Sequence, residues 1–355
     1  MRLDRFNVAD ESELQKDAAP FVSWGATEPE SGQQDGKEVT DMNQAAMEFI
    51  SARLQEGGVI PYLGPGVLSL AEGESPLPGS HGALVGHLTK KTSVPHKIRT
   101  NLTAAAQFIE NFKHRKTVSK AMTEAFDGEA QPTSLHRLLA TIPTIPLVVH
   151  AWYDDLPQKA LRSHSEWGMV QGVSQAEHFG NWVHYFHADG SRVDAETKGK
   201  PEAWKTMLYQ PLGSVWPARN YLVSDSDFVE VLTEIDIQTP IPEPVQQLRR
   251  ERNFLFLGCR FSTQLERLFA RQIMKRSSQK HWAILPEEPT RNEARFLAQY
   301  NIERLAISLP EFVASLEEQM LVHDARVDAN SSPSLQRAAD CSVRHTGLKC
   351  SLDAR

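Results

Sequence analysis

Short apolar runs alternate with amphipathic segments over most of the chain. The apolar runs are bounded by turn-forming residues and predict buried strands. The longer ones fall at Val59–Leu63, Ile145–His150, Phe254–Leu257, Trp282–Leu285 and Ile302–Ile307, and shorter ones at Trp182–His187, Met207–Gln210 and Tyr221–Val223. Between them, apolar residues recur at helical spacing, as at Leu265, Leu268, Phe269 and Ile273. Strands that alternate with helices predict an α/β fold, a parallel sheet with helices on both faces.

The same pattern divides the chain into three parts. Residues 1–40 are poor in apolar residues and rich in Gly, Pro, Ser and Gln, which predicts a disordered acidic arm. Asp41 is suited to cap the first helix of the folded domain, residues 41–322, in which a helical insertion is expected at about 81–140. Residues 323–355 show no apolar period and are expected to form a flexible tail.

The negative charge is concentrated at the N-terminal end. The chain carries a formal net charge of −7, and residues 1–40 hold nine acidic against four basic residues. The remainder is close to neutral and gives no reason to expect a nucleic-acid partner. No apolar run approaches the roughly 18 residues that span a bilayer, so we expect no membrane association.

Cysteine use is typical of a reducing compartment. The three cysteines are Cys259, Cys341 and Cys350, and the last two fall in the expected tail. They form no Cys-x-x-Cys pair, which argues against a structural zinc ribbon, and we expect no metal site. The pattern predicts a cytoplasmic protein rather than a disulfide-stabilised one.

Two strand-to-glycine turns carry the candidate chemistry. The first predicted strand runs into Gly64-Pro65-Gly66, and a later apolar strand runs into Gly258. Glycine lets backbone N–H groups approach a phosphate with no Cβ in the way, so two such turns favour a dinucleotide held across strand ends. The third glycine of the Gly-x-Gly-x-x-Gly fingerprint is Ser69 here, and a tight structural turn is the alternative.

Four separated blocks resemble sirtuin-like domains in their residues and in their order. The blocks are Leu63-Gly64-Pro65-Gly66, Val148–Asp154, Leu212-Gly213-Ser214 and Phe254–Phe261, with supporting flanks at Leu135–Ala140 and Val223–Phe228. The resemblance covers about residues 44–320 and is closest to the zinc-free branch that hydrolyses NAD. It implies a Rossmann-like sheet without a zinc ribbon, and NAD as the bound cofactor.

The match departs from the family pattern where the chemistry is concerned. Trp152 stands where the family has the Asn that positions water, and Leu212 where it has a general-base His. Pro65 and Leu68 replace an Ala and a Ser of the first turn. Leucine neither orients water nor accepts a proton, and an indole donates one hydrogen bond and accepts none. The resemblance therefore supports nucleotide binding more strongly than catalysis.

The resemblance and the residue chemistry together give the candidate site residues. His150 is the candidate substitute base, and Asp154 matches a family position as an acid or a ribose ligand. A structural role is the alternative for His150, as it is for His81, His87, His184 and His187. The residues expected to contact the nucleotide are Gly64, Pro65, Gly66, Trp152, Tyr153, Gly213, Ser214, Gly258, Arg260 and Ser262.

Two classes of function stay open. In the first, the chain binds NAD or ADP-ribose, either as a diverged NAD glycohydrolase that releases nicotinamide or as a non-catalytic sensor with a separate protein partner. The family resemblance implies a bacterial stress or defence setting for it. In the second, Pro65, Trp152 and Leu212 plug the pocket, and the fold is an interaction scaffold. An open cleft favours the first class, and a filled one favours the second.

Overall fold

The computed structural model describes residues 34–177, 180–193, 201–234 and 241–331. The chain divides into two units, Met1–Met42 and Asn43–Arg355. Of the first unit, only the opening part of helix α1 (Gln34–Gln55) is described. The strands and the other described helices belong to the second unit.

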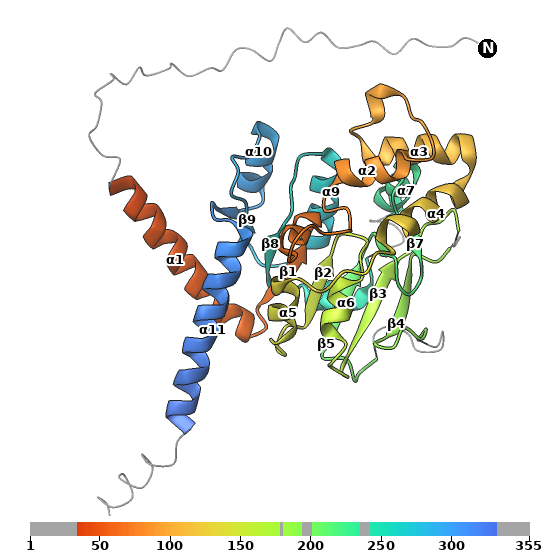
Figure 1. Ribbon diagram of the computed structural model, residues 1–355. Coiled ribbons are helices and arrows are strands. Elements are labelled where there is room, and N and C mark those ends of the chain that lie inside the picture. The colour runs from red at the N-terminus through yellow and green to blue at the C-terminus, as the bar shows by residue number, and fades with distance from the viewer. Residues whose placement is uncertain (1–33, 178–179, 194–200, 235–240, 332–355) are drawn as a thin grey trace, which may run out of the picture. The chain divides into compact units, whose positions relative to one another are not determined.

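An eight-stranded sheet forms the centre of the second unit (Figure 1). Its order is β10-β9-β8-β1-β2-β5-β3-β4, and neighbouring strands are parallel except for β3 and β4. The strands are β1 (Val59–Leu63), β2 (Leu147–His150), β3 (Trp167–Gly172), β4 (Val183–His187), β5 (Thr206–Gln210), β8 (Asn253–Leu257), β9 (His281–Ile284) and β10 (Ile302–Leu305). A separate antiparallel pair joins β6 (Gly213–Ser214) to β7 (Asn220–Tyr221). The mostly parallel sheet confirms the predicted α/β class.

The strand order reverses at β1. From β1 the chain steps to β2 on one side, whereas β8 lies on the other side of β1 and continues outward to β9 and β10. Val59–Leu63 pairs along its whole length with Asn253–Leu257, and every residue of both strands is buried. Two segments that are far apart in the sequence therefore form the central pair of the sheet.

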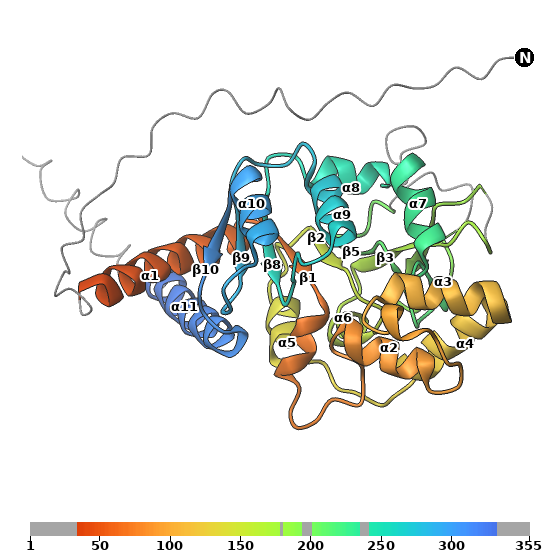
Figure 2. The same cartoon turned by 90° about the horizontal axis from the view of Figure 1, so that it is seen from above.

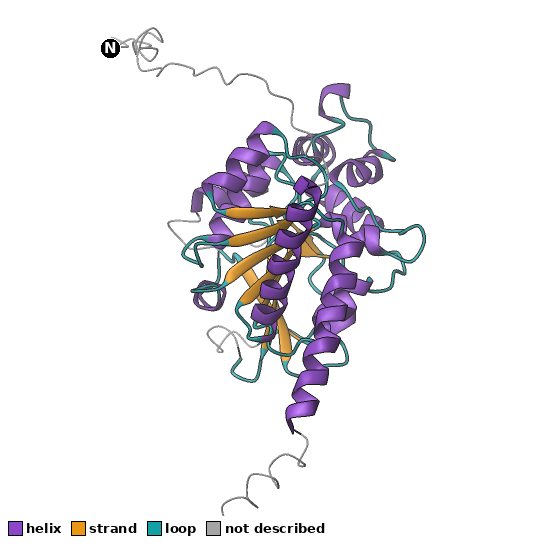
Figure 3. Cartoon of the chain, turned by 90° about the vertical axis from the view of Figure 1, so that its left-hand side faces the viewer, coloured by secondary structure: helices purple, strands orange, loops and turns teal. Residues whose placement is uncertain are grey.

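Helices cover both faces of the sheet (Figure 3). In β1, Val59 and Leu63 join the core on one face, and Ile60 and Tyr62 join the core on the other, because successive side chains of a strand point to opposite faces. The first core also holds residues of α1, α5 (Ser134–Ala140) and α11 (Leu309–Ser331). The second holds residues of α8 (Glu243–Leu248), α9 (Gln264–Met274) and α10 (Arg291–Gln299). Figure 2 shows these two groups on opposite sides of the strands.

A helical insertion connects β1 to β2. After a 3-10 turn at Pro65–Leu70, it forms α2 (His81–Thr89), α3 (Leu102–Lys113) and α4 (Arg115–Phe126), which pack against one another (Figure 1). Ser80 and Asn101 cap α2 and α3 with their side chains. Helix α5 then leads into β2, and α6 (Leu156–Leu161) follows it.

A buried ion cluster fastens the insertion to α7 (Asp225–Glu234). The guanidinium of Arg115, at the start of α4, lies 2.8 Å from the carboxylate of Asp227 and 3.2 Å from that of Glu110. It also donates to the carbonyl oxygen of Tyr221. The Asp227 carboxylate accepts two further backbone N–H groups at the start of α7. These ion pairs and hydrogen bonds fix the position of α4 against α7.

Three elements differ from the sequence pattern. The pattern misses β3, because glycines interrupt it; a Cβ at Gly168 would lie 2.0 Å from the ring of Trp204, so glycine there makes room for the indole. Helix α1 begins before Asp41, and α11 runs on to Ser331, because polar helix formers extend a helix without leaving an apolar period. Residues 1–33 and 332–355, most of the predicted arm and tail, lie outside the described residues.

Candidate functional site

A cavity of about 470 Å³ opens at the carboxyl ends of four neighbouring parallel strands. Gly64 follows β1, Ala151 follows β2, Leu212 follows β5 and Cys259 follows β8, and all four residues line it. The cavity therefore lies where the strand order reverses, which is where open α/β sheets bind ligands.

The helical insertion and the helices α7 and α9 form the remaining walls of this cavity. His81 contributes from the start of α2, and Thr100–Thr103 from the start of α3. Phe228 of α7 and Phe269 of α9 add an apolar wall, with their ring centroids 5.7 Å apart. About half of the enclosure thus comes from segments other than the strand ends.

Polar oxygens from the insertion and α7 meet in the lining. The hydroxyl of Thr103 lies 2.5 Å from the carboxylate of Asp225 and 3.1 Å from the side-chain oxygen of Asn101. All three residues line the cavity. Carboxylate and amide oxygens accept hydrogen bonds from hydroxyl groups, so this corner is suited to a ligand that carries hydroxyls.

The glycines of the two strand-to-turn segments interlock. A Cβ on Gly64 would lie 2.6 Å from the carbonyl oxygen of Gly258, and one on Gly66 would lie 2.9 Å from it. The N–H of Gly64 donates to the carbonyl of Leu257 and that of Gly66 to the carbonyl of Gly258, both at 2.9 Å. The two turns thus use these N–H groups to hold each other. From the sequence, these N–H groups were expected to approach a phosphate, and the close contact of the two turns explains the difference.

The turn after β8 places a carboxylate at the start of α9. Thr263 caps the helix and forms a capping box with Glu266: the Thr263 N–H donates to the Glu266 carboxylate at 2.7 Å, and the Glu266 N–H to the Thr263 hydroxyl at 3.2 Å. The hydroxyl of Ser262 donates to the same carboxylate at 3.1 Å. All three residues line the cavity. The first turn of α9 therefore faces the cavity and brings the negative charge of Glu266 to it.

Arg260 lines the cavity, but its guanidinium is held by carboxylates. Its Nε lies 3.0 Å from Oε1 of Glu293 and its Nη2 lies 3.1 Å from Oε2, and it also pairs with Glu287. Burial would raise the pKa of Glu293, but hydrogen bonds from Arg260 and Thr290 outweigh this effect and lower the pKa to about 2. The phosphate contact predicted for Arg260 therefore has to compete with two carboxylates.

His150 and Asp154 form a buried pair that does not line the cavity. Nε2 of His150 lies 3.1 Å from Oδ2 of Asp154, and each side chain is 1% exposed. Burial would raise the pKa of Asp154, but the His150 ring and the N–H of Leu156 lower it overall. This geometry gives the pair a structural role at the end of β2, because a base enclosed in this way does not reach a ligand in the cavity.

Of the two aromatic residues after β2, one lines the cavity and the other does not. Trp152 is fully buried, and its indole N–H donates to the carbonyl of Pro78 at 2.9 Å. Tyr153 lines the cavity and donates its hydroxyl to the carbonyl of Leu222 at 2.8 Å. Trp152 therefore packs between the insertion and β2, and the cavity stays open beside it.

The turn around β6 stabilises the end of β2 rather than the cavity. Gly213 has a φ of +81°, and a Cβ there would lie 2.1 Å from the carbonyl oxygen of Asn220. The hydroxyl of Ser214 is fully buried and lies 3.3 Å from the carbonyl oxygens of Tyr153 and Asp154. Neither Gly213 nor Ser214 lines the cavity.

Two further titratable side chains reach the cavity. Nδ1 of His81 lies 3.3 Å from Oε1 of Glu266, and the His81 ring meets that of Trp152 edge-on, with centroids 5.2 Å apart. Burial lowers the pKa of His81, and the charge of Glu266 opposes this shift. Burial, and then the Glu266 charge, raise the pKa of the Cys259 thiol, which keeps it protonated and unreactive.

The cavity brings together part of the predicted set. Of the residues expected from the sequence, the cavity is lined by Gly64, Pro65, Tyr153, Arg260 and Ser262. The turns around it are shaped by Gly66, Trp152, Gly213, Ser214 and Gly258. Four polar residues of the lining were not predicted from the sequence: Asn101, Thr103, Asp225 and Glu266. Of these, Glu266 was detectable from the Thr-x-x-Glu capping-box pattern after the fourth block.

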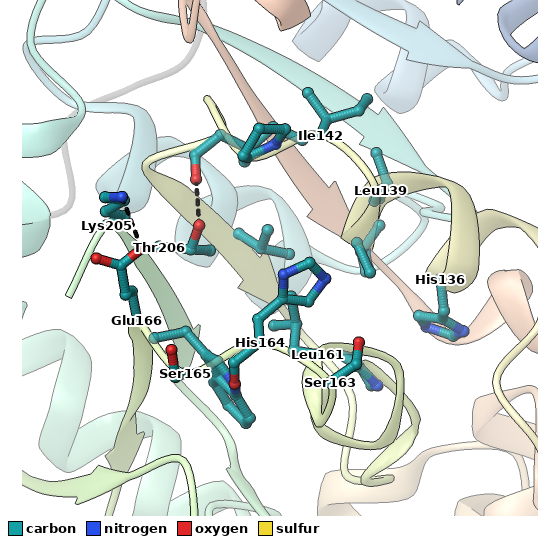
Figure 4. A pocket seen from close by; sticks show the side chains of 17 residues that line it. His136, Leu139, Ile142, Leu161, Ser163, His164, Ser165, Glu166, Lys205 and Thr206 are labelled. Atoms are coloured by element: carbon teal, nitrogen blue, oxygen red, sulfur yellow. Dashed lines mark hydrogen bonds and ion pairs between the residues drawn. The ribbon is translucent and has the colours of Figure 1, made fainter.

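A second cavity, of about 250 Å³, lies between the sheet and the helices α5 and α6. Figure 4 shows His136 at one end of it and the ion pair of Glu166 and Lys205, with an N–O distance of 2.6 Å, at the other. Trp167 and Thr206, at the beginnings of β3 and β5, line it. None of the predicted site residues lines this second cavity.

Two classes of site receive no support from the part of the chain that the structure describes. No group of three or more His, Cys, Asp or Glu side chains there is arranged to hold a metal ion. None of the described helices is both long and apolar enough to cross a membrane.

Most of the sheet region matches a known protein family. Residues 146–305 match the family of SIR2-like domains, which confirms the resemblance to sirtuin-like domains. A comparison with curated proteins finds no match for the chain. The matched segment begins at β2 and ends at β10, so β1 and the helical insertion lie outside it.

Proposed function

We propose that the cavity at the carboxyl ends of β8, β1, β2 and β5 binds NAD or ADP-ribose. The observation that carries the proposal is the position of an open cavity of about 470 Å³ at the reversal of strand order, in a sheet built largely from a SIR2-like domain. Its volume falls within the roughly 300–1,000 Å³ of ligand pockets.

The chemistry of the lining fits the parts of such a nucleotide. Phe228 and Phe269 offer apolar ring faces for a base. Asp225 offers carboxylate oxygens that accept hydrogen bonds from ribose hydroxyls. Arg260 supplies the positive charge of the lining that a phosphate would meet, in competition with Glu287 and Glu293.

The open cavity favours binding over the alternative of an interaction scaffold. The scaffold hypothesis requires Pro65, Trp152 and Leu212 to fill the pocket. Pro65 and Leu212 line the cavity without closing it, and Trp152 is buried outside the lining. No described feature favours the scaffold specifically.

Calorimetric titration of the whole chain with NAD and with ADP-ribose tests the proposal. We expect saturable binding of at least one of them. Asp225→Asn should weaken it about fivefold to tenfold, because a neutral amide oxygen accepts the hydrogen bond of a ribose hydroxyl about 1 kcal/mol less strongly than a carboxylate does. Asp189→Asn is the matched control, because Asp189 is exposed and bonds only within its own turn, to Ser191. Absence of binding by either nucleotide would refute the proposal.

A further inference from the structure

We propose that His81 is the general base of an N-glycosidic bond hydrolysis in this cavity, held in position by Glu266. The inference rests on the proposed nucleotide site and adds a reaction to it. Nδ1 of His81 lies 3.3 Å from Oε1 of Glu266, and both residues line the cavity. They come from the first turns of α2 and α9, which meet at this contact.

The Glu266 carboxylate is fixed before it meets the imidazole. Its Oε2 accepts the N–H of Thr263 at 2.7 Å, the hydroxyl of Thr263 at 2.9 Å and the hydroxyl of Ser262 at 3.1 Å. Oε1 is thereby turned to His81. The negative charge beside Nδ1 favours the tautomer that carries its proton there, which leaves the lone pair of Nε2 to accept another. An acid placed beside one ring nitrogen supports a catalytic histidine in the same way.

His81 is the group in the lining best suited to take a proton near neutral pH. Burial lowers its pKa, and Glu266 limits the fall. Burial raises the pKa of the Tyr62 and Tyr153 hydroxyls, so these are poor bases at neutral pH. The other titratable groups that line the cavity are Asp225, Cys259, Arg260 and Glu266. Leu212 carries no titratable group, and His150 is enclosed with Asp154.

The reaction balances without a further reactant. The oxygen of a water molecule forms a bond to C1′ of the ribose while the bond from C1′ to the nicotinamide nitrogen breaks. The bonding electron pair leaves with that nitrogen, which loses its positive charge, and a water proton passes to Nε2 of His81. The products are nicotinamide and ADP-ribose, and His81 releases its proton to solvent.

The test follows nicotinamide release from NAD by the whole chain, with NAD affinity measured on each variant. We expect His81→Gln to lower kcat at least about 100-fold, the usual contribution of a general base, with NAD affinity changed less than about threefold. His87→Gln is the matched control, because His87 lies on the same helix but not in the cavity lining. It should leave kcat unchanged.

Glu266→Gln separates positioning from folding. Glutamine also completes a capping box, so the midpoint of urea unfolding should stay the same. It removes the negative charge that supports protonated His81, so the pKa of His81 should fall. We therefore expect a lower kcat and an acidic limb of the pH–rate profile that moves to lower pH. An unchanged pH profile would overturn the role of Glu266.

The outcomes distinguish this inference from the nucleotide site itself. If NAD binds but no nicotinamide is released, or if release survives His81→Gln, the base assignment is wrong and the nucleotide site stands. If neither NAD nor ADP-ribose binds, the proposed function fails, and the base assignment fails with it.

Discussion

At the scale of single residues, the glycines of the first and fourth blocks are explained by contact between turns. Gly258 combines a φ of +64° with the absence of space: a Cβ there would lie 2.4 Å from the backbone N of Val67 and 2.7 Å from the carbonyl carbon of Gly66. Backbone atoms cannot move aside as a flexible side chain can. The closeness of β1 and β8 at the edge of the cavity therefore depends on glycine.

We expect Gly258→Ala to destabilise the protein by at least about 2 kcal/mol, the cost of a left-handed alanine together with the displaced turn. Gly73→Ala is the control. Gly73 also has a positive φ, of +85°, but a Cβ there meets nothing within 4 Å, so the cost should be only about 1 kcal/mol. Urea unfolding of both variants measures the difference. Equal losses would show that the turn contact has no energetic weight.

The same scale shows what the sequence could predict about the site. Gly64, Pro65 and Tyr153 could be predicted as site residues, because each follows an apolar strand and the carboxyl ends of parallel strands lie at one edge of the sheet. The proximity of His81 and Glu266 could not be predicted, because it depends on how the insertion packs against α9. A single histidine in a helix carries no signal of its distant partner.

At the scale of elements, the insertion acts as a wall that has to be held in place. Arg115 holds it, because its buried guanidinium joins α4 to α3, α7 and β7. Its side chain is 11% exposed, and that of Asp227 is 1% exposed. Removing one partner would leave the other charge buried without compensation.

We expect Arg115→Met to lower the free energy of unfolding by about 3–5 kcal/mol, because the Asp227 charge stays buried. Lys91→Met is the control, because Lys91 pairs with Glu124 of the same helix α4 at the surface, where the side chains are 75% and 44% exposed. That pair should contribute less than about 1 kcal/mol. Thermal and urea unfolding measure both. A small loss for Arg115→Met would mean that water relieves the Asp227 charge.

Some strands could be predicted from the apolar pattern of the sequence, and others could not. The strands β1, β8 and β9 were predictable from their apolar runs, because they are buried on both faces. The strand β3 was not, because Gly168 serves the Trp204 ring and interrupts the pattern. When a residue type is required by contact with a residue distant in sequence, it gives little information about the local secondary structure.

At the scale of the whole molecule, the family match and the folding unit do not coincide. Residues 146–305 hold every strand of the large sheet except β1. Yet β1 lies between β8 and β2 and pairs with both. Without it, the sheet would split into two parts, each with an unpaired, apolar edge.

We therefore expect a fragment of residues 146–305 to lack a cooperative thermal transition, because its two partial sheets have no strand to join them. A fragment of residues 43–322 contains all eight strands and should unfold as cooperatively as the whole chain. Circular dichroism during heating compares the two. Cooperative unfolding of the shorter fragment would contradict the central role of β1.

The position of β1 in the sheet also determines how long this strand waits for its partner during synthesis. Val59 is made before its partner Asn253, and at about 5–20 residues per second the interval between them is roughly 10 to 40 seconds. During that time one edge of a fully apolar strand has no neighbour. A nascent chain of this protein should therefore need protection by chaperones until β8 has left the ribosome.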